Sequence, residues 1–186
     1  MAQINIPTSG IWSTIASAFN TMMIELYGMT GWGDYTDTQY SAASPMAVNA
    51  NTDTVLSNNK GSVIESQKPV DVDTFYDGTV IKGRSGDGIL ITVEYTAVPT
   101  DQSTNSIETW LDITGGTGTP ETFANLYRTI NTFPKGQDEP RKISFTIAGY
   151  TLGTWQENGA LVKIRADGDC DIYGARLRIT RTHKAR

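Results

Sequence analysis

Three segments near the C-terminal end of the chain alternate between hydrophobic and polar residues. Hydrophobic side chains occupy every second position in residues 142–147, 162–166 and 175–180, and Gly- and Asp-containing stretches separate the three segments. Alternation with a period of two places the hydrophobic side chains on one face of a β-strand and the polar side chains on the other. The pattern therefore predicts three antiparallel strands, with one face on a core and the other toward solvent.

The same alternation continues in the middle of the chain. Residues 74–83, 84–98 and 106–114 each predict a strand, whereas residues 122–133 fit either a strand or a short helix followed by a strand. The total is seven or eight strands, separated by turn-forming residues. This number is typical of a two-sheet sandwich. We therefore expect an all-β protein with a jelly-roll-like β-sandwich.

Residues 9–28 are the one segment with a convincing helical pattern. Ser9 can cap its N-terminus and Gly28 can end it. Hydrophobic residues recur at spacings of three and four, which is typical of one helix face, here called the seam: Trp12, Ile15, Phe19, Met22 and Leu26. The helix either lies on its own domain or serves as a self-association or docking element, and Met23 and Ile24, which leave little polar face, favour the second interpretation.

Residues 29–72 have few hydrophobic residues, many Ser, Thr and Asn, and no sustained period. We expect an extended arm, because a structureless loop of this length inside a compact domain would be unusual. Trp32 and Tyr35 are further candidates for docking, since pure linkers rarely carry such rings. The predicted organisation is residues 1–72 as a helix and arm for anchoring and residues 73–186 as the β-sandwich domain.

The charge distribution argues against some partners. The net charge is -5 with a pI near 4.8, which argues against nucleic acid as the main partner. Five of the last eleven residues are Lys or Arg, and this basic end fits either an acidic neighbour or a solvated strand face. The most hydrophobic segment, residues 11–27, contains too many polar residues to span a bilayer, so we expect no membrane partner. Cys170 is the only cysteine, which excludes an intrachain disulfide.

Catalytic candidates are few. His183 is the only histidine and lies three residues from the C-terminus, where little would hold it for a Ser-His-Asp arrangement. A carboxylate pair for glycoside hydrolysis would come from Glu94, Glu108 and Asp112, but the sequence does not fix their separation. We expect no catalytic residues and therefore no enzyme.

Metal and cofactor motifs are also incomplete. Asp167, Asp169 and Asp171 resemble the start of a calcium loop, but Ile172 and Arg178 stand where an EF-hand has its Gly and Glu. The segment GGTG after residue 113 lacks the Lys of a phosphate loop and reads as a turn. We predict neither a metal site nor a cofactor.

Aromatic residues on strand faces are candidates for ligand contact. Trp110 falls on the polar face of its predicted strand, and Trp155 and Tyr150 lie next to turn residues. Exposed rings at these positions would suit a sugar or a receptor. The alternative for Trp110 is that the second sheet or a subunit partner covers the ring.

The order of these segments resembles that of tailed-bacteriophage virion structural proteins. An N-terminal helix and arm precede a β domain that contains TFPKG, ISFTIAGYTLGTW and a closing IYGARLRITRTHK, and the resemblance covers roughly residues 74–184. In those proteins, C-terminal jelly rolls form trimeric head fibres, capsid decorations or tail spikes. The resemblance implies a location in the virion, a homotrimer, and capsid or tail proteins as partners of the N-terminal part.

Three functions remain open from the sequence. The first is a virion structural protein that assembles through its arm and a trimeric β domain. The second is a carbohydrate- or receptor-binding module that contacts a host glycan. The third, a hydrolase, is the weakest.

Overall fold

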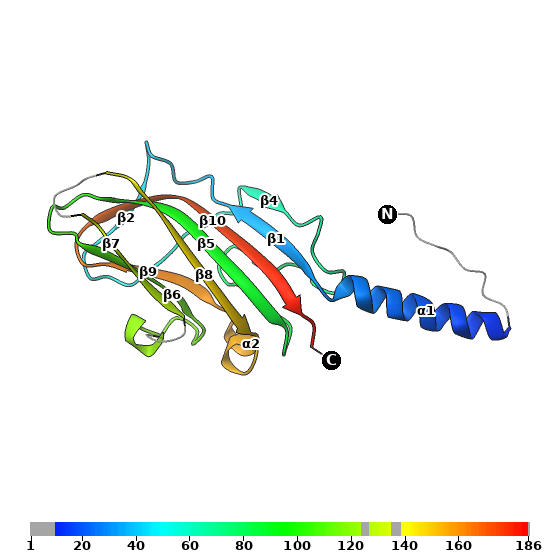
Figure 1. Cartoon of the computed structure of the whole chain (residues 1–186). Coiled ribbons are helices and arrows are strands. Elements are labelled where there is room, and N and C mark those ends of the chain that lie inside the picture. The colour runs from blue at the N-terminus through cyan, green and yellow to red at the C-terminus, as the bar shows by residue number, and fades with distance from the viewer. Residues whose placement is uncertain (1–9, 124–126, 135–138, 186) are drawn as a thin grey trace.

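The computed structural model describes residues 10–123, 127–134 and 139–185 of the chain. Two antiparallel sheets face each other, and a helix extends from one end of this sandwich (Figure 1). The all-β sandwich predicted from the sequence is therefore confirmed.

The larger sheet has six strands and contains both the first and the last strand of the chain. Its path runs β4-β1-β10-β5-β8, and β2 pairs with the part of β10 that precedes the β1 pairing. Its members are β1 (Gly31–Thr36), β2 (Met46–Val48), β4 (Ser62–Ile64), β5 (Gly88–Pro99), β8 (Arg141–Tyr150) and β10 (Cys170–His183). We call it sheet A.

The smaller sheet, here called sheet C, has four strands in the order β3-β9-β6-β7. They are β3 (Thr54–Val55), β6 (Ser106–Asp112), β7 (Arg128–Thr132) and β9 (Leu161–Ala166). The chain changes sheets between β5 and β6, between β7 and β8, and at each step from β8 to β10. This alternation, with β1-β10-β5-β8 facing β3-β9-β6-β7, is the strand order of a jelly roll. The three C-terminal strands predicted first are thus antiparallel members of two sheets rather than direct neighbours.

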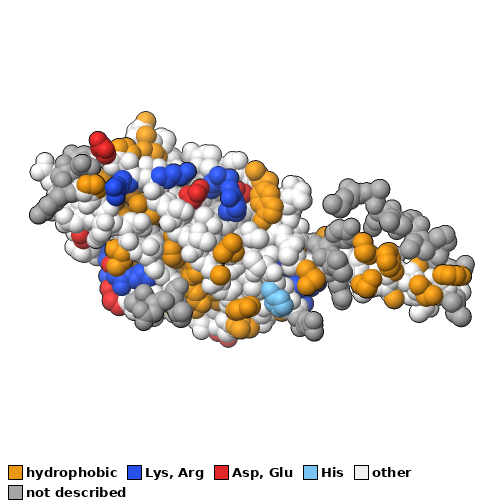
Figure 2. Space-filling model, viewed as in Figure 1, with side chains coloured by type: hydrophobic (Ala, Val, Ile, Leu, Met, Phe, Trp, Pro, Cys, Tyr) orange, Lys and Arg blue, Asp and Glu red, His pale blue; other side chains and the backbone are white. Residues whose placement is uncertain are grey.

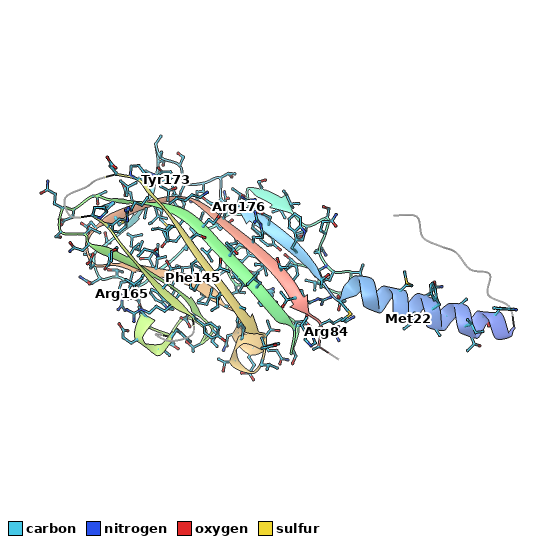
Figure 3. The ribbon with its side chains drawn as sticks, viewed as in Figure 1. Met22, Arg84, Phe145, Arg165, Tyr173 and Arg176 are labelled. Atoms are coloured by element: carbon cyan, nitrogen blue, oxygen red, sulfur yellow. The ribbon has the colours of Figure 1, made fainter. Side chains whose placement is uncertain are left out.

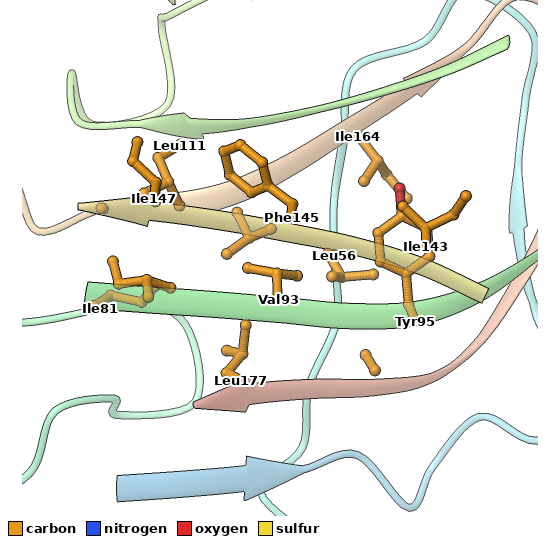
Figure 4. Close-up of a cluster of buried hydrophobic side chains, with 14 of the residues drawn as sticks. Leu56, Ile81, Val93, Tyr95, Leu111, Ile143, Phe145, Ile147, Ile164 and Leu177 are labelled. Carbon is orange, nitrogen blue, oxygen red and sulfur yellow. The ribbon is translucent and has the colours of Figure 1, made fainter. Parts of the chain in front are cut away.

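The core lies between the sheets and is built from the alternating positions (Figure 4). Val93 and Leu177 from sheet A face Leu111 and Ile164 from sheet C, and all four side chains are at most 1% exposed. Burial in β5 and β8 follows the alternation of the sequence. Because the period matches the pleat, the hydrophobic side chains of each strand reach the same interior.

Three helical segments accompany the sheets. The helix α1 spans Ile11–Gly28 and projects away from the sandwich (Figure 1). The 3-10 helix η1 covers Pro120–Phe123, so the helix-then-strand alternative for residues 122–133 is the observed one. The one-turn helix α2 occupies Thr154–Asn158, where the sequence predicted a turn.

The segment expected to be an extended arm differs from the prediction. Residues 29–72 supply β1 to β4, and β1 pairs with β10 over six residue positions. Leu56 and Tyr35 lie in the core. The arm is extended, as expected, but it is part of the sandwich, because Tyr35 lies opposite Leu177 of β10 and the Leu56 N–H donates to the carbonyl of Val162 in β9. The boundary at residue 72 therefore does not separate the sheets from the rest of the chain.

The predicted strand at residues 74–83 is also different in the structure. It forms only isolated bridges, Tyr76 to Ile81 and Ile81 to Ala160. Its hydrophobic residues still enter the core, since Phe75 and Ile81 are at most 2% exposed. The alternating hydrophobic residues here belong to a segment that runs from Tyr35 of sheet A to Ala160, next to β9 of sheet C, and not to a ladder.

Candidate assembly surface

The seam of α1 is exposed to solvent. Trp12 is 71% exposed, Ile15 53%, Phe19 40% and Met22 50%. A surface helix normally turns its hydrophobic face toward its own core. Here Met22 lies on the part of α1 that projects from the sandwich (Figure 3), and hydrophobic side chains follow the length of the helix in Figure 2. The seam is therefore available to a partner.

The composition of α1 is unusual for a helix that stands alone in water. Glu25 is its only charged residue, and its first turn lacks an acidic side chain. A helix of this length gains little from propensity alone and needs tertiary or quaternary packing. Contact with another hydrophobic surface is the interaction that the helix lacks in the single chain.

The remaining predicted docking residues have different positions. The side chain of Leu26 lies outside the described part of the chain. Trp32 is half-buried on the outer face of sheet A, where it lies opposite Thr180. Tyr35 is fully buried, so the prediction that it contacts a partner is wrong.

Tyr35 faces the core because it follows the pleat of β1 one residue after Asp34. Its hydroxyl donates to Glu65 at 2.5 Å and accepts from the Phe75 backbone N–H at 3.1 Å. Burial raises the pKa of Tyr35 to about 12, and the Glu65 carboxylate acts in the same direction. The ring thus anchors the segment around Phe75 to sheet A.

Trp110 and Trp155 are not available to an external ligand, because they are 0% and 1% exposed. Trp110 does lie on the outer face of sheet C, as its position in the strand predicted. The guanidinium of Arg165 stands 6.0 Å from its ring centre and pairs with Glu121 of η1 at 3.3 Å, so the loop after β6 returns over this face. The covering group is therefore part of the same chain.

Trp155 is buried because of its place on the short helix α2. Gly153 and Gly159, with φ of 51° and 71°, allow the short helix α2 to turn back against the sheet edge. The Trp155 indole N–H then donates to the carbonyl of Ile81 at 3.3 Å. Tyr150, the third predicted ligand-contact residue, remains 61% exposed.

The carboxylates tested for hydrolysis are held in ion pairs. Glu108 pairs with Arg128, and Asp112 lies 2.9 Å from the Lys163 ammonium. Glu108 and Asp112 are four residues apart on one strand, about 13 Å, which exceeds the spacing of a hydrolase pair. Glu94 projects from the other sheet. These three carboxylates do not form a paired site.

The Asp167–Asp171 segment holds turns together. Asp167 accepts the backbone N–H groups of Asn105 at 2.8 Å and Ser106 at 2.9 Å, and Asp169 accepts that of Ala50 at 2.8 Å. The described residues contain no group of three or more acidic, His or Cys side chains arranged for a metal ion.

In the same part of the chain, no helix has the length and hydrophobicity needed to cross a membrane.

The basic end of the chain is neutralised within the fold. Asp34 accepts from Arg176 at 2.6 Å and from Arg178 at 3.3 Å, and the Arg176 hydrogen bond holds the Asp34 pKa below its ordinary value (Figure 3 shows Arg176 on this face). Arg181 is fully buried and binds Asp71 at 2.6 Å and Asp87 at 2.9 Å. The sequence offered a solvated strand face as one explanation of this basic end. That explanation does not apply to Arg181, which is buried.

Comparison with known proteins finds distant structural similarity. No protein-family model and no curated protein sequence matches the chain. The PRD1 vertex protein P5 aligns over 84% of this chain and 74% of its own, with 12% identity and a TM-score of 0.44. The Eiger TNF structure from S. frugiperda aligns over 85% and 96%, with 9% identity and a TM-score of 0.49. Similarities this distant assign neither a function nor a partner to the chain.

Proposed function

We propose that this protein is a non-enzymatic virion structural component that assembles as a homotrimer through α1 and its β domain. Capsid or tail proteins are then the other partners of the N-terminal part. The virion setting and the number of three copies come from the resemblance to tailed-bacteriophage virion structural proteins. The assembly role has support of its own in the geometry of α1.

The exposed seam is the observation that carries the proposal. Taking about 150–250 Å² for each large side chain, its four described members expose on the order of 400 Å². At about 25 cal/mol per Å², covering that area is worth roughly 10 kcal/mol for each helix before the costs of association. Copies of the helix are suitable partners, because the seam repeats at heptad spacing and carries no charge that would repel a like surface.

The test is the mass of the full chain in solution, measured by light scattering. We expect the wild-type protein to have three times the mass of one chain. The mass of Phe19→Asp should fall toward that of a single chain, because assembly would bury the new carboxylate away from water. Ser17→Asp is the matched control, because Ser17 is exposed on the opposite side of α1 and its variant should remain assembled. A wild-type chain that stays monomeric at all concentrations would contradict the proposal.

A carbohydrate- or receptor-binding module is the second candidate, and the exposed ring of Tyr150 favours it. An aromatic ring of this kind is a suitable platform for a host glycan. A glycan array with wild type and Tyr150→Ala tests this function. Binding that falls at least about tenfold in the variant supports it, and an array without any bound glycan counts against it.

A further inference from the structure

A row of uncharged side chains crosses the outer face of sheet A next to α1. The strand register places Trp32 opposite Thr180, Thr180 opposite Leu90, and Leu90 opposite Ala148. Tyr150 lies at the end of β8 beside this row. Leu90 is 36% exposed and Tyr150 is 61% exposed, because the pleat turns both side chains away from the core. Both are nevertheless hydrophobic or aromatic.

The rest of this face has the opposite character. Asp34, Glu94, Arg176 and Arg178 lie further along the same strands, and their charges are paired with one another. In Figure 2, charged side chains form a row along the upper part of the body, and hydrophobic side chains are scattered over it, including near the base of α1. The outer face of sheet A is thus divided into a self-neutralised charged half and an apolar half adjacent to α1.

We infer that the apolar half of sheet A is the surface through which the β domains of neighbouring copies contact each other. The inference rests on the proposed self-assembly and identifies the face that the copies share. The apolar half consists of Trp32, Leu90, Ala148, Tyr150 and, just beyond β8, Leu152. Its occupant is another copy of the chain, packed around the same threefold axis as the seams.

The chain connectivity favours a second copy over a different protein. Gly28 ends α1, and Trp32 follows four residues later, so at most about 14 Å of chain separates the helix from the apolar half. Copies that meet along their seams must therefore bring this end of their sandwiches together. Met29 stands between the two surfaces in the sequence, and its side chain, 46% exposed, adds to the hydrophobic area between them.

The area argues in the same direction. Met29 and the exposed members of the apolar half, Leu90, Ala148, Tyr150 and Leu152, together expose about 400 Å², estimated as for the seam. The seam alone therefore provides only about half of the roughly 800 Å² per partner of a standard interface, and the two surfaces together reach it. The apolar half supplies the area that α1 lacks.

Charge variants in the full chain test the assignment. Leu90→Glu and Tyr150→Glu place a carboxylate in the apolar half, and each should weaken association at least about tenfold, measured by light scattering over a concentration series. Ile130→Glu is the matched control, because Ile130 is 52% exposed on β7 of the other sheet and should leave the mass unchanged. Far-UV circular dichroism checks that each variant is folded.

Hydroxyl-radical footprinting of the wild-type chain gives an independent readout that does not depend on a variant. Tyr150 should react several-fold more slowly in the assembled than in the diluted protein, whereas Tyr173, on the far part of β10, should not change (Figure 3). Two results would overturn the inference and leave the proposed function standing. One is a Tyr150 reactivity that does not change on assembly. The other is that both Glu variants associate like wild type while Phe19→Asp dissociates. A wild-type chain without any assembly instead removes the proposed function.

Discussion

Replacement of Arg181 by Met should destabilise the protein more than any other single change of a charged residue at the base of α1. The guanidinium of Arg181 is 0% exposed and binds Asp87, which is 2% exposed, and Asp71, which is 23% exposed. Methionine preserves most of the volume but leaves the Asp87 carboxylate buried and without this partner. Breaking a buried pair from one side costs about 3–5 kcal/mol, because an uncompensated charge remains.

The assay is urea unfolding of the full chain at one fixed concentration, followed by the fluorescence of the buried tryptophans. With a slope of about 2–3 kcal/mol per M, the expected loss lowers the midpoint by roughly 1–2 M. Arg84→Met is the control, because Arg84 binds the same Asp71 at 2.9 Å but is half exposed, so its loss should cost less than about 1 kcal/mol. Equal effects of the two substitutions would refute the role assigned to burial.

Three further predictions concern the sandwich. The pKa of Asp71 is held below its ordinary value, first by hydrogen bonds from Arg181, so the contribution of Asp71 to stability is present above about pH 4 and is lost as the pH falls further. Urea midpoints measured between pH 2 and 7 should show this loss, and the loss should be smaller in Arg181→Met. Gly83→Ala should cost about 1–3 kcal/mol, because the added Cβ would overlap the buried side chain of Thr151; a thermal melt unchanged from wild type would contradict this. Tyr95→Phe removes a buried hydrogen bond of 2.6 Å to Thr109 and should cost about 1–3 kcal/mol, whereas the double variant with Thr109→Val should recover much of the loss; a double variant as unstable as the sum of both single variants would contradict the pairing.

The long strands were predictable because their patterns agree with their environments. The hydrophobic positions of β5, β8, β9 and β10 repeat over enough residues to define a period, and each of these strands has one face on the core. The strands β2, β3 and β4 are two or three residues long, too short for any period to be visible. They form because β10, β9 and β1 offer unpaired edges, which is a property of the assembled sheets.

The seam of α1 was visible in the sequence because its spacing is local. For Trp110, the sequence predicted the face of the sheet on which the ring lies but not its burial, because the loop that returns from β6 covers it. Leu90 carries a signal that the sequence did offer, namely a hydrophobic residue at a polar-face position of β5. Its neighbours Trp32 and Ala148 could not be assembled into one row without the register of four strands.

The central place of β10 determines when the chain can fold during synthesis. This strand, Cys170–His183, separates β1 from β5, so sheet A cannot close until β10 itself has left the ribosome. Contacts between residues so far apart in sequence also form slowly. The hydrophobic seam of α1 is therefore synthesised and exposed before the sandwich can fold. Until β10 is made, the strand β1 that follows α1 lacks the neighbour that fixes it in sheet A, so the helix has no folded body beside it.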